Sequence, residues 1–265
     1  METKAVFGLP RAFYVLALGE FLFDLTTYVT QPIFTIYILG LGGTILQVGL
    51  ILSLQSLLTI VMRIPLTLAA RRVGERRMLC AAFAVQAAAP LLYYLAPGPD
   101  WLYFIPFLQI VATGSFFQVA LSMASNMALP SRQGDALGRY MAIMSSRMFV
   151  GPVICGALLV YLGYAQLFLV AALFPIVGLF LFLRFSSEIS NPAAVELKSR
   201  AQRTSQLRSM RATLSERNVL AISFIRILYS ISNNVFHTLF AIYAVQQLGF
   251  SLSTVSLLFS AEGLA

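Results

Sequence analysis

Residues 12–38 read AFYVLALGEFLFDLTTYVTQPIFTIYI, an apolar stretch interrupted by two acids, Glu20 and Asp24. A helix needs about 20 apolar residues to cross roughly 30 Å of hydrocarbon, so this stretch is long enough to span a bilayer. Strands of a membrane barrel would be about 10 residues long and would alternate in polarity. The stretch therefore predicts a membrane-spanning helix. It is too long and too acidic for a cleavable signal peptide.

The composition extends this prediction to the whole chain. Hydrophobic residues make up 59% and charged residues 11% of the 265 residues, and the mean hydropathy is +0.83. Soluble domains have about 45–50% apolar and about 25% charged residues. Because lipid offers no hydrogen bonds to the backbone, only helices or closed barrels can span it. We therefore expect an all-α membrane protein.

The basic residues predict the topology. We expect spanning helices at 12–38, 45–70, 78–96, 102–125, 140–162, 165–184 and 218–245, with an eighth starting near 252. The connections 39–44, 97–101, 163–164 and 246–251 contain no Lys or Arg, whereas the alternate connections are basic. Short basic loops stay in the cytoplasm. The pattern predicts a multi-pass protein of the plasma membrane with a cytoplasmic N-terminus.

The stretch 185–217 is polar and basic, and we interpret it as a cytoplasmic linker. The alternative is an amphipathic helix on anionic lipid, because apolar residues recur in its second part.

A repeat divides the chain. Residues 34–37, FTIY, reappear as FAIY at 240–243, and after one inserted residue Leu41-Gly42 matches Leu248-Gly249. The repeat unit is therefore six helices. We predict a six-helix bundle over 1–184, the linker over 185–217, and the start of a second, truncated bundle over 218–265.

The loop between the second and third helices carries a motif. Residues 67–77 read TLAARRVGERR, which resembles the Gly-x-x-x-Asp-Arg-x-Gly-x-Arg-Arg loop of the major facilitator superfamily. The matching residues are Arg72, Gly74, Arg76 and Arg77. Thr67 replaces the first Gly and Arg71 replaces the acid. The resemblance implies a cytoplasmic gate. In the family the acid anchors the charge network that closes this gate, so its replacement by Arg71 departs from the family pattern. Alternatively, these arginines only determine topology.

A second motif lies in the fifth helix. Gly151, Pro152 and Gly156 fall on a pattern similar to the Gly-Pro-x-x-Gly-Gly motif of antiporters in this family. Proline removes a helical hydrogen bond and glycine allows close helix approach, so we expect a kink. The resemblance implies two six-helix halves, alternating access and transport of a small solute, with proton-coupled export as one form of it. Ile110 stands where drug–proton antiporters often carry an Arg.

Polar residues recur at helical spacing inside the spans. We expect them to face one central aqueous cavity that takes the substrate. In the first helix they are Tyr28, Gln31 and Thr35, on the face of Glu20 and Asp24; in the fourth, Gln109, Thr113, Gln118, Ser122 and Asn126; in the seventh, Ser230, Asn233 and His237.

Charged residues in the spans are candidates for ion coupling, because such charges are costly unless they are paired or hydrated. Asp24 lies roughly 18 Å into its helix, near the bilayer centre. The proton-coupling candidates are Asp24, Glu20, Arg226 and Arg147. The alternative is a static ion pair of Asp24 with Arg147 or Arg226. His237 could equally be a packing residue.

Other classes of function lack their motifs. The sequence has no Gly-rich phosphate loop with its lysine, no metal-ligand cluster and no cofactor motif. The net charge of +8 follows the loops, which argues against nucleic acid. We expect no enzyme activity. The rival hypothesis is a truncated, non-transporting protein or a partner-binding membrane subunit, and residues beyond Ala265 would decide between them.

Overall fold

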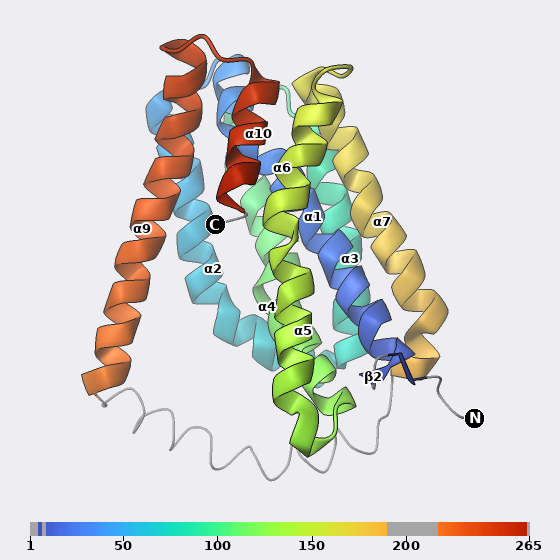
Figure 1. The fold of residues 1–265 in the computed structure, drawn as a ribbon. Coiled ribbons are helices and arrows are strands. Elements are labelled where there is room, and N and C mark those ends of the chain that lie inside the picture. The colour runs from blue at the N-terminus through green and yellow to red at the C-terminus, as the bar shows by residue number, and fades with distance from the viewer. Residues whose placement is uncertain (1–4, 7–8, 190–216, 264–265) are drawn as a thin grey trace.

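The computed structural model describes residues 5–6, 9–189 and 217–263. Some side chains within the helices, including those of Arg226, Ser230, Asn233 and His237, lie outside the described ones. The described chain is a bundle of long helices, which confirms the all-α prediction (Figure 1). A pair of two-residue strands, β1 (Ala5–Val6) and β2 (Leu9–Pro10), precedes the bundle and was not predicted.

The described helices up to Ile189 follow the predicted segments. These helices are α1 (Arg11–Gly40), α2 (Ile45–Val73), α3 (Glu75–Tyr94), α4 (Ile105–Met127), α5 (Gln133–Ser145), α6 (Arg147–Leu158) and α7 (Tyr164–Ile189). Short 3-10 turns, η1 (Pro99–Tyr103) and η2 (Pro130–Arg132), precede α4 and α5. By length and hydropathy, four described segments can span a membrane: Arg11–Gly40, Pro99–Met127, Gln133–Leu158 and Tyr164–Phe185.

Two predicted segments differ from the structure by more than three residues at a boundary. The segment expected as one helix over 140–162 begins at Gln133, ends at Leu158 and is interrupted at Ser146, between α5 and α6. Asp135 lies in its first turn and pairs with Arg139 one turn later at 2.9 Å, and both features favour a helix. Because the same stretch is polar, hydropathy does not predict a helix there. Similarly, α7 continues to Ile189 rather than ending at 184.

The repeat reappears in the backbone. Helix α9 (Arg217–Gln246) has the same length as α1, 30 residues, and α10 (Leu252–Glu262) follows a turn like that before α2. Gly42 and Gly249 both have positive φ, 84° and 66°. Thr44 and Ser251 each accept a backbone N–H three residues on, both at 3.2 Å. The same turn and the same cap therefore recur at both places, as the sequence repeat predicts.

Helix α1 lies at the centre of the packing. Its Gly19 faces the carbonyl of Gly178 on α7, and Thr26 donates to the carbonyl of Ala171 at 3.0 Å. These contacts bring α1 and α7 close together along one side, as small residues do in membrane bundles. Helix α1 also packs on α5, α6 and α10 (Figure 1). There its Glu20 and Asp24 meet Tyr140 of α5 and Arg147 of α6.

Candidate functional site

The centre of the site is an ion pair inside the bundle. Nη1 of Arg147, the first residue of α6, lies 2.7 Å from Oδ2 of Asp24 on α1. The Asp24 and Arg147 side chains are only 21% and 17% exposed. Two charges removed from water are retained only when they compensate each other, and loss of one partner costs about 3–5 kcal/mol. Of the two pairings considered from the sequence, the structure shows the one with Arg147.

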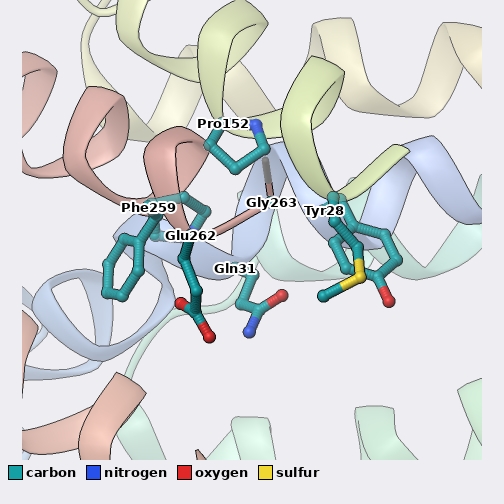
Figure 2. Close-up of a pocket in the computed structure, with 8 residues that line it drawn as sticks. Tyr28, Gln31, Pro152, Phe259, Glu262 and Gly263 are labelled. Atoms are coloured by element: carbon teal, nitrogen blue, oxygen red, sulfur yellow. The ribbon is translucent and has the colours of Figure 1, made fainter. Parts of the chain in front are cut away.

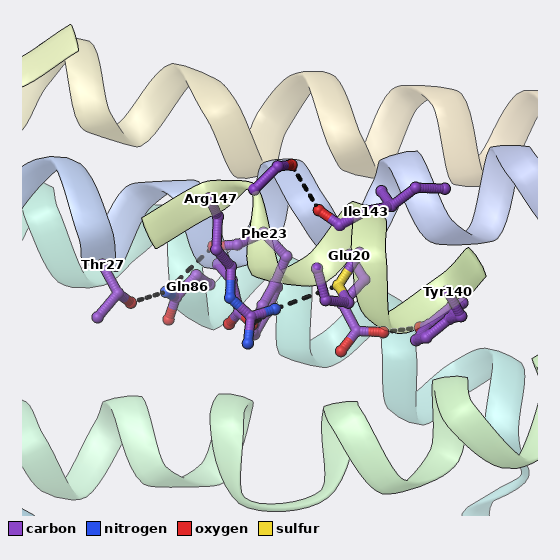
Figure 3. A network of polar contacts seen from close by, with 10 residues as sticks. Glu20, Phe23, Thr27, Gln86, Tyr140, Ile143 and Arg147 are labelled. Carbon is purple, nitrogen blue, oxygen red and sulfur yellow. Dashed lines mark hydrogen bonds and ion pairs between the residues drawn. The ribbon is translucent and has the colours of Figure 1, made fainter. Parts of the chain in front are cut away.

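A second carboxylate lies one turn from the first. Glu20 is 1% exposed and its Oε2 accepts a hydrogen bond from the hydroxyl of Tyr140 on α5. Among the residues that the structure describes, its Oε1 has no hydrogen-bond partner. Its burial leaves the Glu20 side chain almost no contact with water. Figure 3 shows Glu20 between Tyr140 and Arg147 along α1.

Further contacts position Arg147 and connect α1 to its neighbours. The guanidinium of Arg147 lies over the ring of Tyr28, 5.3 Å from its centre, and Nη1 also contacts the Met144 sulfur at 3.1 Å. On another side of α1, the amide of Gln86 on α3 donates to Thr27 Oγ1 at 3.1 Å (Figure 3). A cation over an aromatic face is stabilised by the ring quadrupole, so Tyr28 helps to place Arg147.

A small cavity opens beside the ion pair, with a volume of about 100 Å³. It lies among α1, α6 and α10, and Figure 2 shows the side chains of Gln31 and Glu262 at it. Its lining residues are Tyr28, Gln31, Pro32, Met148, Pro152, Phe259, Glu262 and Gly263. Tyr28 therefore belongs both to the cavity and to the surroundings of Arg147, which connects the two.

Other predicted cavity residues lie elsewhere. Thr35 is buried, and Gln109 accepts a hydrogen bond from Tyr93 at 2.8 Å while its carbonyl accepts one from Thr113. The Tyr93–Gln109 bond joins α3 and α4, and none of these residues lines the cavity. Gln118 is half-buried, and Ser122 and Asn126 are exposed, outside the cavity lining. The predicted residues Ser230, Asn233, His237 and Arg226 lie outside the described side chains.

Glycines let three helices meet at the site. A Cβ on Gly151 would lie 2.5 Å from Cβ and 2.8 Å from the carbonyl carbon of Tyr28. On Gly156 a Cβ would lie 3.1 Å from the carbonyl oxygen of Ser253 on α10. Pro152, between them, is buried within α6. The motif therefore brings α6 against α1 on one side and against α10 on the other.

The loop motif forms a tight turn. Gly74 separates α2 from α3 with φ 96°, a conformation that a side chain would strain. Arg76 and Arg77 are exposed in the first turn of α3, and the Arg72 side chain lies outside the described ones. The side chains of Arg76 and Arg77 therefore lie on the surface of the protein at this turn.

Sequence reasoning missed several residues of the site: Gln86, Tyr140, Met148, Phe259 and Glu262. The spacing of Tyr140 and Arg147 is two helical turns, which places them on one face, and that signal could have found Tyr140. Glu262 is an acid within an apolar run, which is also a recognisable signal. Nothing in the local sequence marks Gln86 as a partner of α1.

The fold and the site define a multi-pass helical membrane protein with an ion pair in its core. The family model of the Major Facilitator Superfamily matches residues 16–265, and the chain belongs to this family. It is 26% identical over 152 residues to an uncharacterized MFS-type transporter of Methanocaldococcus jannaschii, covering 56% of this chain and 39% of that protein. Uncharacterized MFS-type transporter YbcL of Bacillus subtilis is 21% identical over 166 residues, covering 63% of this chain and 43% of YbcL.

Solved structures show the same fold. A mutant of the peptide transporter POT in complex with sulfate matches with a TM-score of 0.72 at 18% identity, over 99% of this chain and 67% of that chain. A POT family transporter in complex with a thioalcohol conjugated peptide matches with a TM-score of 0.65 at 18% identity, over 96% and 50%. The chain thus spans less than half of the two curated relatives and about half to two thirds of these structures.

Proposed function

We propose that the chain is the first six-helix half, with the start of the second, of a secondary transporter that moves a small solute by alternating access. The observation that carries this proposal is the Asp24–Arg147 pair beside the cavity between α6 and α10. In transporters of this kind the solute binds near the membrane midplane where two bundles meet. Family membership supports the class of function.

The cavity is the proposed contact point for the solute in this half. It offers an amide from Gln31, a carboxylate from Glu262 and the aromatic rings of Tyr28 and Phe259. A few polar groups within an apolar lining are typical of small-molecule sites. Because Tyr28 also packs under Arg147, a solute in the cavity would disturb the ion pair. We expect Ser230, Asn233 and His237 to complete the cavity from α9.

Asp24 is the proposed coupling carboxylate, with Glu20, Arg147 and Arg226 as the other charged groups of the relay. A carboxylate that cycles between its protonated and ionised forms can drive transport only if the inward-open and outward-open states hold its charge differently. In this structure Arg147 compensates Asp24 at 2.7 Å. A state in which Arg147 is displaced would favour the protonated form of Asp24. Protons would then move against the solute in export or with it in import.

The cytoplasmic gate is proposed at the loop of Arg72, Gly74, Arg76 and Arg77. We expect this loop, the N-terminus and the linker over 185–217 to lie in the cytoplasm of a plasma-membrane protein, because basic residues stay inside. Single cysteines in the full-length protein test this. An impermeant thiol reagent applied outside should label a cysteine placed at Pro99 and should not label one at Arg203. The opposite pattern of labelling would overturn the topology.

A transport screen tests the proposed function. The full-length protein, reconstituted in liposomes, should exchange at least one labelled small solute across the membrane, and a pH gradient should drive its accumulation. Liposomes without protein provide the background. Absence of uptake for all solutes, with correctly folded protein, would instead favour a non-transporting or partner-binding membrane subunit.

A further inference from the structure

The helix that carries Arg147 is interrupted one residue before it. Ser146 lies between α5 and α6, and its hydroxyl donates to the carbonyl of Ile143 at 2.7 Å. In an unbroken helix that carbonyl would receive the N–H of Arg147. Serine hydroxyls that bond back to the preceding turn bend helices. Pro152, six residues on, removes another helical donor. The segment is therefore weakened at two points close to the ion pair.

The two parts of this interrupted helix hold different carboxylates. Tyr140, on α5, donates to Glu20, whereas Arg147, on α6, pairs with Asp24 (Figure 3). Among the described residues, the charged and titratable groups that act on Glu20 are Asp24, Arg147 and the phenol of Tyr140. In this part of the structure Arg147 is thus the one cation beside two acids, Asp24 and Glu20. An uncompensated charge in a membrane core is costly, so we expect one of the two acids to hold a proton.

The two parts also have different neighbours. The ring of Tyr140 packs edge-on against Phe13 of α1, and Arg139 reaches Tyr14 of α1 at 3.4 Å, so α5 is held by α1. In contrast, α6 packs both on α1, where Gly151 meets Tyr28, and on α10, where the Cys155 sulfur lies 3.3 Å from the Ser256 hydroxyl. A displacement of α10 would therefore reach α6 before it reaches α5.

We propose that Ser146 is a hinge that lets Arg147 pair in turn with Asp24 and Glu20, while Tyr140 is the positioning residue that keeps Glu20 in place. This inference rests on the proposed proton-coupled transport. With Arg147 on Asp24, as in this structure, Glu20 holds the proton. When α6 moves with α10, Arg147 pairs with Glu20; Glu20 then gives up one proton and Asp24 takes up one. The two acids carry one proton in either state, but the site of that proton changes.

Infrared difference spectra of the full-length protein in liposomes test the role of Tyr140 without any transport assay. Titration with acid should reveal a carboxylic C=O band that Glu20→Gln removes. In Tyr140→Phe the midpoint of this band should move to higher pH by about one unit, because the ionised carboxylate loses a donor. The control Tyr93→Phe deletes another buried phenol that donates to a side chain, Gln109, and should leave the midpoint unchanged. A native midpoint in Tyr140→Phe, or a band that survives Glu20→Gln, overturns the proposal.

The hinge is tested by the distance between spin labels at two exposed positions, Met141 on α5 and Tyr161 after α6. In the native protein the distance distribution should contain two populations, one for each pairing of Arg147, because the two states interconvert. Ser146→Ala should give one narrow distribution, whereas the control Ser145→Ala should behave like the native protein. Identical distributions in all three proteins refute the hinge. If the band and the distances behave as expected but no solute is transported, only the proposed function fails.

Discussion

Asp24→Asn should abolish accumulation of the solute against its gradient while leaving exchange between equal pools. Asparagine keeps the shape of the side chain but cannot carry a proton, so each transport cycle would run without coupling. A pH gradient of one unit supports roughly tenfold accumulation for each coupled proton, because 1.4 kcal/mol corresponds to a factor of ten. In the variant the ratio of inside to outside concentration should fall to one. Uptake by the full-length protein in liposomes measures both quantities.

A matched control for this prediction is Asp135→Asn. Asp135 also pairs with an arginine, Arg139 at 2.9 Å, but it is 49% exposed at the start of α5. Exposed pairs contribute little to stability, so this variant should accumulate solute as the native protein does. Undiminished accumulation in Asp24→Asn would mean that the carboxylate is structural and that coupling occurs elsewhere.

Gly151→Ala should destabilise the protein by about 3 kcal/mol, the upper part of the usual range for overpacking. The new Cβ would lie 2.8 Å from the carbonyl carbon of Tyr28, and backbone atoms of a central helix cannot move aside cheaply. Helix α6 would have to separate from α1, which would also lengthen the Asp24–Arg147 contact. Thermal unfolding of the purified full-length protein, followed by circular dichroism, measures the loss.

Gly49→Ala is the control for this substitution. A Cβ on Gly49 meets no atom within 4 Å, so the added methyl group should change the unfolding temperature little. Alanine also favours helix over glycine by roughly 1 kcal/mol, which works toward stability in both variants. Equal unfolding temperatures for the two variants would contradict the close approach of α6 and α1.

Hydropathy alone was enough to predict the helices, because lipid requires about 20 apolar residues per span. It could not predict the interruption at Ser146, where the cause is one hydroxyl bonded to the carbonyl of Ile143. It also placed the start of α5 too late, since an amphipathic turn stabilised by Asp135 and Arg139 does not read as apolar. Such local polar contacts depend on side-chain geometry, which the average hydrophobicity of a segment does not report.

The candidate site was predicted in part for a similar reason. Helical spacing placed Glu20, Asp24 and Tyr28 on one face of α1, but it could not say which neighbour each residue would meet. Gln109, from the same kind of reasoning, accepts a hydrogen bond from Tyr93 away from the cavity. A polar residue in a membrane span must find a partner, and packing of the helices decides whether that partner is protein or solute.

The most direct test of the central claim is proton movement driven by the solute. The full-length protein is reconstituted in liposomes that contain a pH-sensitive dye, and a transported solute is added with no initial pH gradient. We expect a change of internal pH in native liposomes, no such change when a protonophore is present, and none with Asp24→Asn. Transport of the solute by the native protein with no change of internal pH would contradict the account.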